Sequence, residues 1–171
     1  MRRVCYAVAT SLDGYIAGPD GAFDWIVMDP EIDFGGLYAR FDTVLMGRQT
    51  FEVAARGGSA AIPGMKTVVV SRTLRPEDHP GVTVVADRVE EAVARLRAEP
   101  GKDVWLFGGG SLFRTLLAAR LVDAVEVTVS PVLLGGGLPL LPPPADRTKL
   151  RLVGHKVYKS GIVSLEYAVD S

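Results

Sequence analysis

The sequence has little cysteine, little histidine and almost no net charge. Its one cysteine, Cys5, excludes an intrachain disulfide and a metal cage built from cysteines alone. The two histidines leave few ligands for a histidine-based metal site, so no metal is expected. Basic and acidic residues number 19 and 20, for a formal net charge of -1. Nucleic acids and membrane surfaces attract proteins with a basic face, so neither is an expected partner.

Long hydrophobic runs are also missing. No stretch reaches the roughly 18 apolar residues of a membrane span. The apolar run after Met1-Arg2-Arg3 is too short for a signal peptide, because it soon meets Ser11 and Asp13. We therefore expect a soluble, cytoplasmic protein. Its 171 residues, 48% of them hydrophobic, fit one domain that spans residues 1–171.

Glycine, by contrast, is plentiful. The chain has 19 glycines and 11 prolines, and the glycines gather at a few points between apolar runs. Such glycines mark tight turns or places where the backbone approaches a ligand closely, and composition alone leaves both interpretations open. The main clusters are Gly14–Gly21, Gly35-Gly36, Gly57-Gly58, Gly108–Gly110 and Gly135–Gly137.

The first two thirds of the chain alternate strands with helices. Apolar runs predict buried strands at Val4–Ala9, Thr43–Met46, Lys66–Val70, Val82–Val85 and Val104–Phe107. Helical patterns fall at Pro30–Phe41, Arg48–Arg56, Val89–Glu99 and from Gly108–Gly110 through Ala118, with Asp29 as N-cap of the first. The fourteen-residue loop Ser11–Asp24 is long enough for a functional lid.

The last third of the chain reads as antiparallel. Val125, Val127 and Val129 alternate with polar residues, which is typical of a half-exposed strand. Leu138–Pro144 is a proline-rich loop. Leu150–Tyr158 and Ile162–Val169 predict a hairpin. The sequence thus predicts an α/β fold: a mixed, mostly parallel central sheet flanked by helices, with a C-terminal antiparallel hairpin.

Three strand-to-helix or strand-to-loop junctions carry groups that suit phosphate. Gly108–Gly110 combines close-approaching backbone with a helix N-terminus, and Gly47–Thr50 repeats that arrangement and adds the forked cation of Arg48. Ser71–Thr73 adds hydroxyls and Arg72 at a third strand end. Each has a plain structural alternative: a tight turn, a solvated first-turn arginine and a polar loop. Together they favour a ligand with several phosphates, such as a dinucleotide.

These residues also carry a family resemblance. The chain resembles the dihydrofolate reductase superfamily, and within it the reductase domain of riboflavin biosynthesis and its free-standing bacterial relatives. The matching segments are Ala9–Ala17, Asp42–Phe51, Val70–Thr73, Gly108–Leu112, Leu121–Asp123 and Ser130–Gly137, which in order and spacing cover nearly the whole chain. The relatives imply a dihydrofolate-reductase-like fold and NADPH as cofactor.

Carried over position by position, the resemblance assigns the cofactor site. Gly47, Arg48, Gln49 and Thr50 would hold the pyrophosphate and adenosine side, and Ser71 and Arg72 the 2′-phosphate. The run Gly108, Gly109, Gly110, Ser111 and Leu112 would cradle the pyrophosphate and place the nicotinamide. Ile16 and Gly18 would cover the nicotinamide ring, with Ala7 and Ala9 on the floor of its pocket.

The substrate side is less defined. Asp13 and Asp33 are the candidate catalytic carboxylates. Asp13 stands in the family's Ser-Leu-Asp-Gly motif, although Asp-Gly is also a common turn pair. Asp33, or Glu31, could occupy the place of the dihydrofolate reductase carboxylate or be a solvated acid at a helix start. Candidate substrate contacts are Trp25, Phe51, Thr128 and Pro131, with Trp25 equally suited to anchoring the lid or the core.

The resemblance implies an NADPH-dependent reductase that passes hydride to a pyrimidine- or pterin-like small molecule, like 5-amino-6-(5-phosphoribosylamino)uracil reductase. Two alternatives stay open: a true dihydrofolate reductase, and a nucleotide-binding module without turnover. Arg56 and Lys66 form no firm motif for a sugar phosphate. The related reductase domains are commonly dimers, so a homodimer is expected, with the C-terminal hairpin as a natural contact.

Overall fold

The computed structural model describes residues 1–58 and 62–170. Its strands are β1 (Val4–Ser11), β2 (Tyr15–Ala17), β3 (Phe41–Gly47), β4 (Lys66–Val70), β5 (Val82–Val85), β6 (Asp103–Gly108), β7 (Ala124–Ser130), β8 (Leu138–Pro139), β9 (Leu150–Val157) and β10 (Val163–Val169). Its helices are α1 (Phe34–Ala39), α2 (Arg48–Arg56), α3 (Val89–Ala98) and α4 (Gly110–Ala118), with a 3₁₀ turn at Pro76–Asp78.

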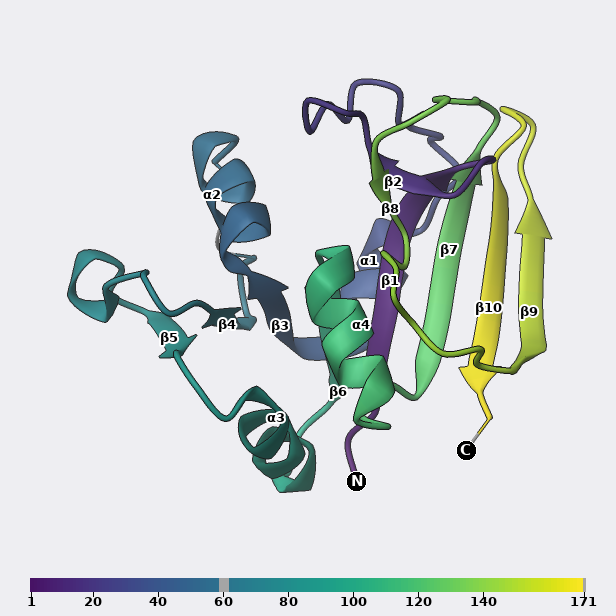
Figure 1. Cartoon of the computed structure of the whole chain (residues 1–171). Coiled ribbons are helices and arrows are strands. Elements are labelled where there is room, and N and C mark those ends of the chain that lie inside the picture. The colour runs from purple at the N-terminus through teal and green to yellow at the C-terminus, as the bar shows by residue number, and fades with distance from the viewer. Residues whose placement is uncertain (59–61, 171) are drawn as a thin grey trace.

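Eight of these strands form one twisted sheet in the order β5-β4-β3-β6-β1-β7-β10-β9 (Figure 1). All neighbouring pairs from β5 to β7 are parallel, whereas β10 runs antiparallel to both β7 and β9. The predicted α/β fold, with its mostly parallel sheet and C-terminal hairpin, is therefore confirmed.

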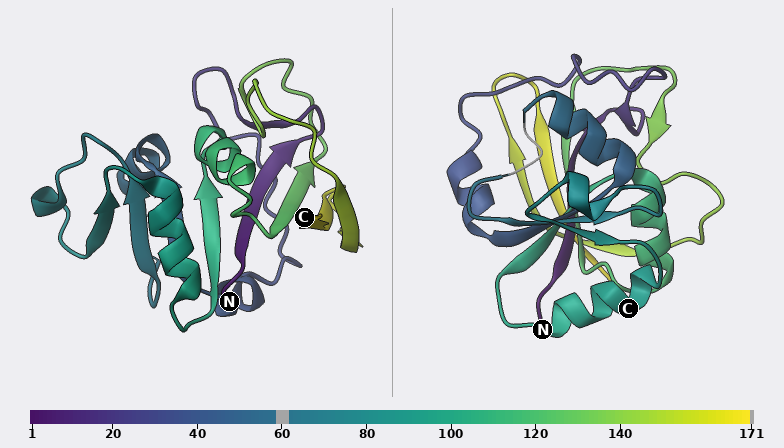
Figure 2. Two further views of the ribbon diagram at one scale, coloured as in Figure 1. Left: turned by 60° about the horizontal axis from the view of Figure 1, so that its bottom comes forward. Right: turned by 90° about the vertical axis from the view of Figure 1, so that its left-hand side faces the viewer.

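The helices cover the two faces of the sheet in pairs. Leu37 of α1 and Phe51 of α2 pack on one face, which we call the α1 face. Val93 of α3 and Leu116 of α4 pack on the opposite face, the α4 face. The two views in Figure 2 show this separation. Because α1 and α2 carry the chain outward to β4 while α3 and α4 carry it back to β7, the winding direction changes beside β1 and β6.

The main core lies on the α4 face, where the apolar runs of the parallel strands meet α3 and α4. Tyr6 on β1 stacks on Phe113 of α4 with ring centroids 3.9 Å apart. Leu106 and Leu116 are fully buried beside them. These contacts fix α4, and with it the junction that precedes α4, against the two central strands.

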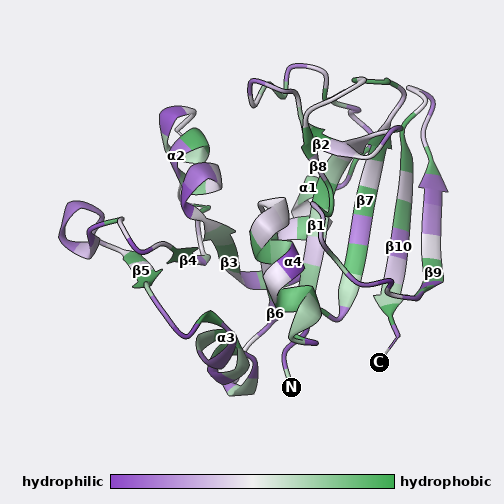
Figure 3. Ribbon diagram, viewed as in Figure 1, coloured by the Kyte–Doolittle hydropathy of each residue, from purple (hydrophilic) through white to green (hydrophobic). Residues whose placement is uncertain are grey.

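Strand β7 shows the alternation that its sequence predicts. Val125 and Val127 are buried in the core of the α4 face, whereas Glu126 and Thr128 point to the α1 face and stay partly exposed. In Figure 3 the bands of opposite hydropathy along β7 follow this pattern. The polar half of β7 therefore faces the side of the sheet that carries α1.

The first helix is shorter than expected. The sequence predicts a helix over Pro30–Phe41 with Asp29 as N-cap, but α1 begins at Phe34 and its N-cap is Asp33. The reason is that Asp29 is buried and its carboxylate accepts hydrogen bonds from the backbone of Glu31 and from Ser160 in the β9–β10 turn. Asp29 therefore fixes the preceding segment to the hairpin, and Phe41 already belongs to β3.

Two segments expected to be loops contain short strands. Tyr15–Ala17, inside the predicted loop Ser11–Asp24, forms β2, and Leu138–Pro139, inside the proline-rich segment, forms β8. The two pair antiparallel as a separate small sheet. Neither segment is long enough to show a strand period on its own, so only their mutual pairing reveals them.

No helix of the described residues has the length and apolar character needed to cross a membrane.

Candidate functional site

A patch of the central strands on the α1 face is left uncovered. Ala7 and Ala9 on β1 are partly exposed, although β1 lies in the interior of the sheet. Glu126 and Thr128 are their neighbours on β7, in register with Ala7 and Ala9. A central strand with small, accessible side chains on one face is a natural floor for a flat ligand. We call these four residues the floor.

The floor opens at the C-terminal ends of the parallel strands. Strand β1 pairs with β6 only as far as Tyr6 and Leu106, so the two strands separate beyond that point. The winding direction of the chain changes at the same place. Crevices of this kind are where open α/β sheets bind their ligands.

The two glycine junctions predicted to bind phosphate meet at this crevice. A Cβ on Gly47 would lie 3.9 Å from the backbone nitrogen of Gly109, so the β3–α2 and β6–α4 junctions are direct neighbours. Thr50, in the first turn of α2, lies beside both Gly108 and Gly109. Gly108 has a φ of +140°, a conformation that side-chain-bearing residues rarely adopt. The sequence-based expectation that these glycines share one site therefore agrees with their positions.

Both helices that start here begin without a side-chain cap. The N-cap residues are Gly47 for α2 and Gly109 for α4, and neither offers a side chain to the first-turn amides. Two sets of N–H groups at positive helix ends are thus available to an acceptor in the crevice. A pyrophosphate supplies such acceptors, and a Cβ on Gly108 would narrow the same space beside Thr50. The residues present therefore fit a dinucleotide.

The third junction, Ser71–Thr73, is joined to the β3–α2 junction by a hydrogen bond. Nη1 of Arg48 donates to Oγ1 of Thr73 over 2.7 Å. Oγ of Ser71 accepts from the backbone nitrogens of Thr73 and Leu74, over 3.1 and 2.9 Å. Ser71 thus shapes the loop after β4 and is itself 7% exposed, whereas Arg72 beside it is exposed. Arg48, Arg72 and Thr73 are the groups best placed to meet a phosphate here.

The rest of the predicted cofactor residues lie in the first turns of α2 and α4 and in the segment of β2. Gln49 and Ser111 are exposed in the first turns of α2 and α4, and Leu112 is buried in the core of the α4 face. Ile16 lies in β2, and Gly18 follows that strand. None of these positions contradicts the expected roles, which stay predictions.

The segment that carries Ile16 is not a free loop. β2 pairs with β8, and Leu12 and Leu140 donate backbone hydrogen bonds to Val132 and Gly14 across the same two segments. Gly137 lies so close to β2 that a Cβ there would be 2.1 Å from the carbonyl oxygen of Ala17. The first half of the expected lid, from Leu12 to Gly18, is therefore joined to the segment that follows β7.

Asp13 makes the strongest of these connections. Its carboxylate accepts from Oγ of Ser11 over 2.7 Å and from the backbone nitrogens of Leu134 and Gly135 over 3.1 and 2.8 Å. These bonds, that of Ser11 first, lower the pKa of Asp13 to about 2. At neutral pH the carboxyl is fully ionised. It has no proton to give, so its geometry favours a positioning role over that of a catalytic acid.

The low pKa of Asp13 sets the pH range of this connection. The folded pKa lies below the ordinary value of 3.8, so the stabilisation is complete above about pH 4 and is lost as pH falls through about 2. We expect Asp13→Asn to break at least one of the bonds, because an amide nitrogen cannot accept. Hydrogen exchange at the amides of Leu134 and Gly135 should then accelerate about tenfold or more at pH 7. Asp24→Asn, an exposed residue of the same loop, should leave those rates unchanged.

Asp33 is occupied as a helix cap. It is exposed, and its Oδ1 accepts from the backbone nitrogen of Gly36 over 2.9 Å. Trp25 donates from Nε1 to the carbonyl oxygen of Ala22 over 2.9 Å, a contact within its own loop. Both positions match the structural alternatives considered for them, namely an acid at a helix start and a lid anchor. A catalytic role for Asp33 and a substrate contact for Trp25 stay predictions.

Of the remaining predicted substrate contacts, the prediction for Phe51 is wrong. It is 3% exposed and packs between α2 and the sheet with Val44, Met46 and Val69. A ring enclosed in this way belongs to the core, because the apolar face of α2 must be buried against β3 and β4. Thr128 is on the floor, as expected for a substrate contact. Pro131 is exposed beside Gly161 of the β9–β10 turn.

Two motif segments have structural roles that the sequence did not reveal. In Leu121–Asp123, the carboxylate of Asp123 accepts from the backbone nitrogen of Val4 over 2.8 Å and from Arg97 over 2.8 Å, which joins α3 to the start of β1. In Gly135–Gly137, the first glycine donates to Asp13 and the last makes room for β2. Both motifs therefore fix the frame around the crevice.

One pair of charged residues on the α1 face was missed. Arg40, the C-cap of α1, donates from Nη1 and Nη2 to the two oxygens of Glu126 over 2.9 and 2.5 Å. These hydrogen bonds raise the pKa of Arg40. The strict alternation along β7 could have placed Glu126 beside Thr128, but nothing in the sequence pointed to Arg40 as its partner.

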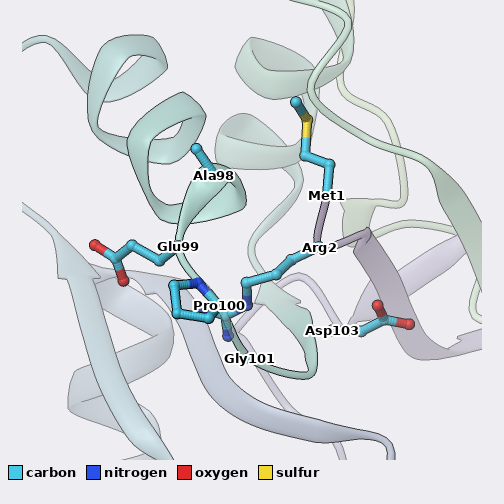
Figure 4. A pocket seen from close by; sticks show the side chains of 7 residues that line it. All are labelled: Met1, Arg2, Ala98, Glu99, Pro100, Gly101 and Asp103. Atoms are coloured by element: carbon cyan, nitrogen blue, oxygen red, sulfur yellow. The ribbon is translucent and has the colours of Figure 1, made fainter.

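Two cavities lie away from this crevice. One of about 380 Å³ lies at the opposite, N-terminal ends of the strands and is lined by Met1, Arg2, Ala98, Glu99, Pro100, Gly101 and Asp103 (Figure 4). The other, of about 230 Å³, lies between α3 and strands β3 to β5. Neither contains a glycine junction or a floor residue, so the crevice is the better candidate site. Within residues 1–58 and 62–170, no cluster of three or more metal-ligating side chains occurs.

The fold and the crevice together define an α/β protein of the dihydrofolate reductase type. A dihydrofolate reductase from Enterococcus faecalis, solved in complex with NADP(H), matches 99% of this chain and 97% of its own with a TM-score of 0.73 and 20% identity. A putative riboflavin biosynthesis protein from Shewanella sp. PV-4 covers 100% of both chains with a TM-score of 0.85 and 27% identity. The predicted fold family is thereby confirmed.

The chain belongs to the RibD C-terminal domain family, whose sequence model matches residues 2–164. The uncharacterized protein YyaP of Bacillus subtilis is 33% identical over 178 residues, covering 97% of this chain and 94% of that protein. The riboflavin biosynthesis protein RibD of Mycobacterium tuberculosis is 31% identical over 147 residues, covering 78% of this chain and 43% of that protein. Membership supports a pyrimidine-reductase-like oxidoreductase function.

Proposed function

We propose that the protein is an NADPH-dependent reductase that transfers hydride to a pyrimidine- or pterin-like small molecule. The observation that carries the proposal is the pair of uncapped helix N-termini, at Gly47 and Gly109, that meet beside the uncovered floor. The first feature suits the pyrophosphate of a dinucleotide, and the second suits a flat ring.

Some residues of the crevice would bind the cofactor, and others would orient the nicotinamide and the substrate. The amides that follow Gly47 and Gly109 would hold the pyrophosphate, and Arg48 and Arg72 would contact the 2′-phosphate of the adenosine. Bound NADPH supplies the hydride from its nicotinamide ring. The β2 segment, fixed by Asp13 and Gly137, would cover the nicotinamide ring and exclude water from the reacting carbon. Ala9 and Thr128, side by side on the floor, leave room for a substrate ring against the nicotinamide.

A comparison of NADPH with NADH binding tests the proposed role of Arg72 at the 2′-phosphate directly. Arg72 is exposed next to Thr73, so replacing it with alanine should weaken NADPH binding by about 1–3 kcal/mol, the scale of a charge-assisted contact, and leave NADH nearly unchanged. Titrations followed by nicotinamide fluorescence measure both constants. Arg75→Ala is a matched control, because Arg75 is exposed nearby and pairs with Glu77.

The same titrations decide the proposal itself. Absence of NADPH binding at millimolar cofactor would refute the reductase. Equal losses for both cofactors in Arg72→Ala would refute the 2′-phosphate role alone.

The second candidate is a nucleotide-binding module without turnover. It is favoured by the two predicted carboxylates, since Asp13 is held ionised by three hydrogen bonds and Asp33 caps α1. NADPH that binds but is not oxidised with any pterin or pyrimidine would support this candidate. Tight methotrexate binding would instead support a true dihydrofolate reductase.

A further inference from the structure

The side chain of Trp105 on β6 reaches across the point where β1 and β6 separate. Its indole nitrogen Nε1 donates to the carbonyl oxygen of Ala7 over 2.9 Å. Trp105 is 7% exposed, and its ring packs against those of Phe41 and Phe107, with centroids 5.4 and 5.1 Å away. Because Ala7 is a floor residue, this hydrogen bond joins the floor to the neighbouring strand.

The backbone of β1 explains why the carbonyl of Ala7 needs this donor. In a parallel sheet the main-chain groups of every second residue point towards the same neighbouring strand. The carbonyl oxygen of Arg3 accepts from the backbone nitrogen of Val104, so that of Ala7, four residues further on, also faces β6. The pairing of β1 with β6 ends at Tyr6 and Leu106, one residue before Ala7. The indole therefore supplies a donor where the ladder has stopped.

An irregularity in β6 accompanies the separation of the two strands. On its other side β6 pairs with β3, and there one step along β3 spans two residues of β6. The additional residue is Phe107, which makes this a β-bulge, and a bulge bends its strand. The bulge lies between Trp105 and the glycine junction that begins at Gly108. Trp105 is thus the last residue on this face of β6 before the strand turns towards the cofactor junction.

The position of Trp105 connects the two parts of the proposed reaction site. The substrate ring would lie on the floor, over Ala9 of β1, whereas the cofactor pyrophosphate would lie at the junction that follows β6. Hydride transfer requires the nicotinamide and the substrate at a fixed separation, and a displacement of about 1 Å can lower the rate about 100-fold. The hydrogen bond of Trp105 holds β1 and β6 together beside the place where this separation is set.

We propose that Trp105 is a positioning residue that holds the floor strand at a fixed distance from the strand that leads to the cofactor junction. The proposal rests on the proposed function, since it concerns hydride transfer in the same crevice. Trp105 is too buried to be a main contact of either ligand, so its effect passes through Ala7 to the floor. Removal of the hydrogen bond should therefore change the rate of hydride transfer more than the affinity for either ligand.

The variant Trp105→Phe tests this, because phenylalanine keeps an aromatic ring but has no N–H group. The measurement is single-turnover oxidation of NADPH by 5-amino-6-(5-phosphoribosylamino)uracil, with separate titrations of the two ligands. We expect hydride transfer to slow about tenfold or more, while both dissociation constants stay within about twofold. An unchanged rate, or a loss confined to the dissociation constants, would overturn the proposal.

Val104→Ala is the control for a merely structural effect. Val104 is the neighbour of Trp105 on β6, but it is fully buried in the core of the opposite, α4 face. The smaller side chain should lower the stability of the protein and leave the bond to Ala7 intact. At a temperature where both variants are folded, its rate of hydride transfer should stay within about twofold of that of the wild type. Equal slowing in the two variants would overturn the positioning role.

Hydrogen exchange in the ligand-free protein provides a test that needs no turnover. Val8 and Thr10 lie in the part of β1 that continues beyond the separation and pairs with β7. Their amides should exchange about tenfold or more faster in Trp105→Phe than in Val104→Ala. Equal exchange rates would show that the indole does not fix the floor, whether or not NADPH binds. If NADPH is not oxidised by the probe, the proposed function fails for that substrate, and the exchange rates still decide the role of Trp105.

Discussion

Replacing Gly137 with alanine is expected to destabilise the protein by about 2–6 kcal/mol. Gly137 has a φ of +144°, which costs a side-chain-bearing residue roughly 1–3 kcal/mol. The added Cβ would also lie 2.1 Å from the Ala17 carbonyl oxygen and 3.1 Å from the carbonyl carbon of Gly18, and overpacking of this kind costs roughly another 1–3 kcal/mol. Both obstacles are backbone, so relief requires β2 to move away from β8.

The displacement of β2 gives this substitution a functional signature as well. Ile16 and Gly18 lie on the displaced segment, so NADPH should bind more weakly to Gly137→Ala even where the protein remains folded. Urea unfolding and NADPH titration measure the two effects. Gly136→Ala is a close control, because a Cβ on Gly136 meets nothing within 4 Å. If the free energies of unfolding of the two variants differ by less than about 0.5 kcal/mol, Gly137 does not lie as close to β2 as described.

The second large loss of stability is expected at the N-terminal ends of the strands, on removal of Asp42. The side chain of Arg2 is 5% exposed, and its guanidinium pairs with Asp42 and donates to Oγ1 of Thr43 over 2.8 Å. Asp42→Ala would leave this buried cation without its counter-ion, which typically costs about 3–5 kcal/mol. The same carboxylate accepts from the backbone nitrogen of Lys102 over 2.8 Å, so that N–H group would also be left without its acceptor. Thermal or urea unfolding measures the change.

A neighbouring ion pair supplies the matched control. Arg3 and Asp103 lie next to the first pair, but the side chain of Arg3 is 54% exposed. Asp103→Ala should therefore cost no more than about 1 kcal/mol, the usual limit for a solvated pair. Figure 4 shows Arg2 and Asp103 among the residues that line the neighbouring cavity. Equal decreases in the free energy of unfolding for Asp42→Ala and Asp103→Ala would contradict the assignment of Arg2 as a buried cation. Neither variant should change the affinity for NADPH, since both lie at the opposite end of the strands from the crevice.

Local pattern was sufficient to predict most of the sheet. The apolar runs at Val4–Ala9 and Thr43–Met46 become β1 and β3, and the alternation over Val125–Val129 becomes β7. These predictions succeed because a strand buried on both faces must be apolar throughout, and one buried on a single face must alternate. The predicted start of α1 was wrong because it depends on a contact between residues that are distant in the chain. Asp29 has the chemistry of an N-cap, but its hydrogen bond with Ser160, 131 positions away, removes it from that role.

The features of the candidate site also fall into two groups, those that the sequence predicts and those that only the fold reveals. Glycine junctions after buried strands, and Arg48 and Arg72 beside them, could be identified in the sequence because phosphate binding needs bare backbone and fixed cations, which are local properties. The adjacency of Gly47 and Gly109, the pairing of Arg40 with Glu126 and the burial of Phe51 depend on residues that are distant in the chain. No spacing rule encodes them.

Glycine illustrates the division most clearly. From sequence, the many glycines between apolar runs indicated turns or ligand approach, and composition together with periodicity was enough for the α/β class, because both depend on residues a few positions apart. Only the folded chain shows that Gly108 and Gly109 line the crevice, whereas Gly137 makes room for another strand. The role of a missing side chain depends on what lies beside it, and that is decided when distant segments pack.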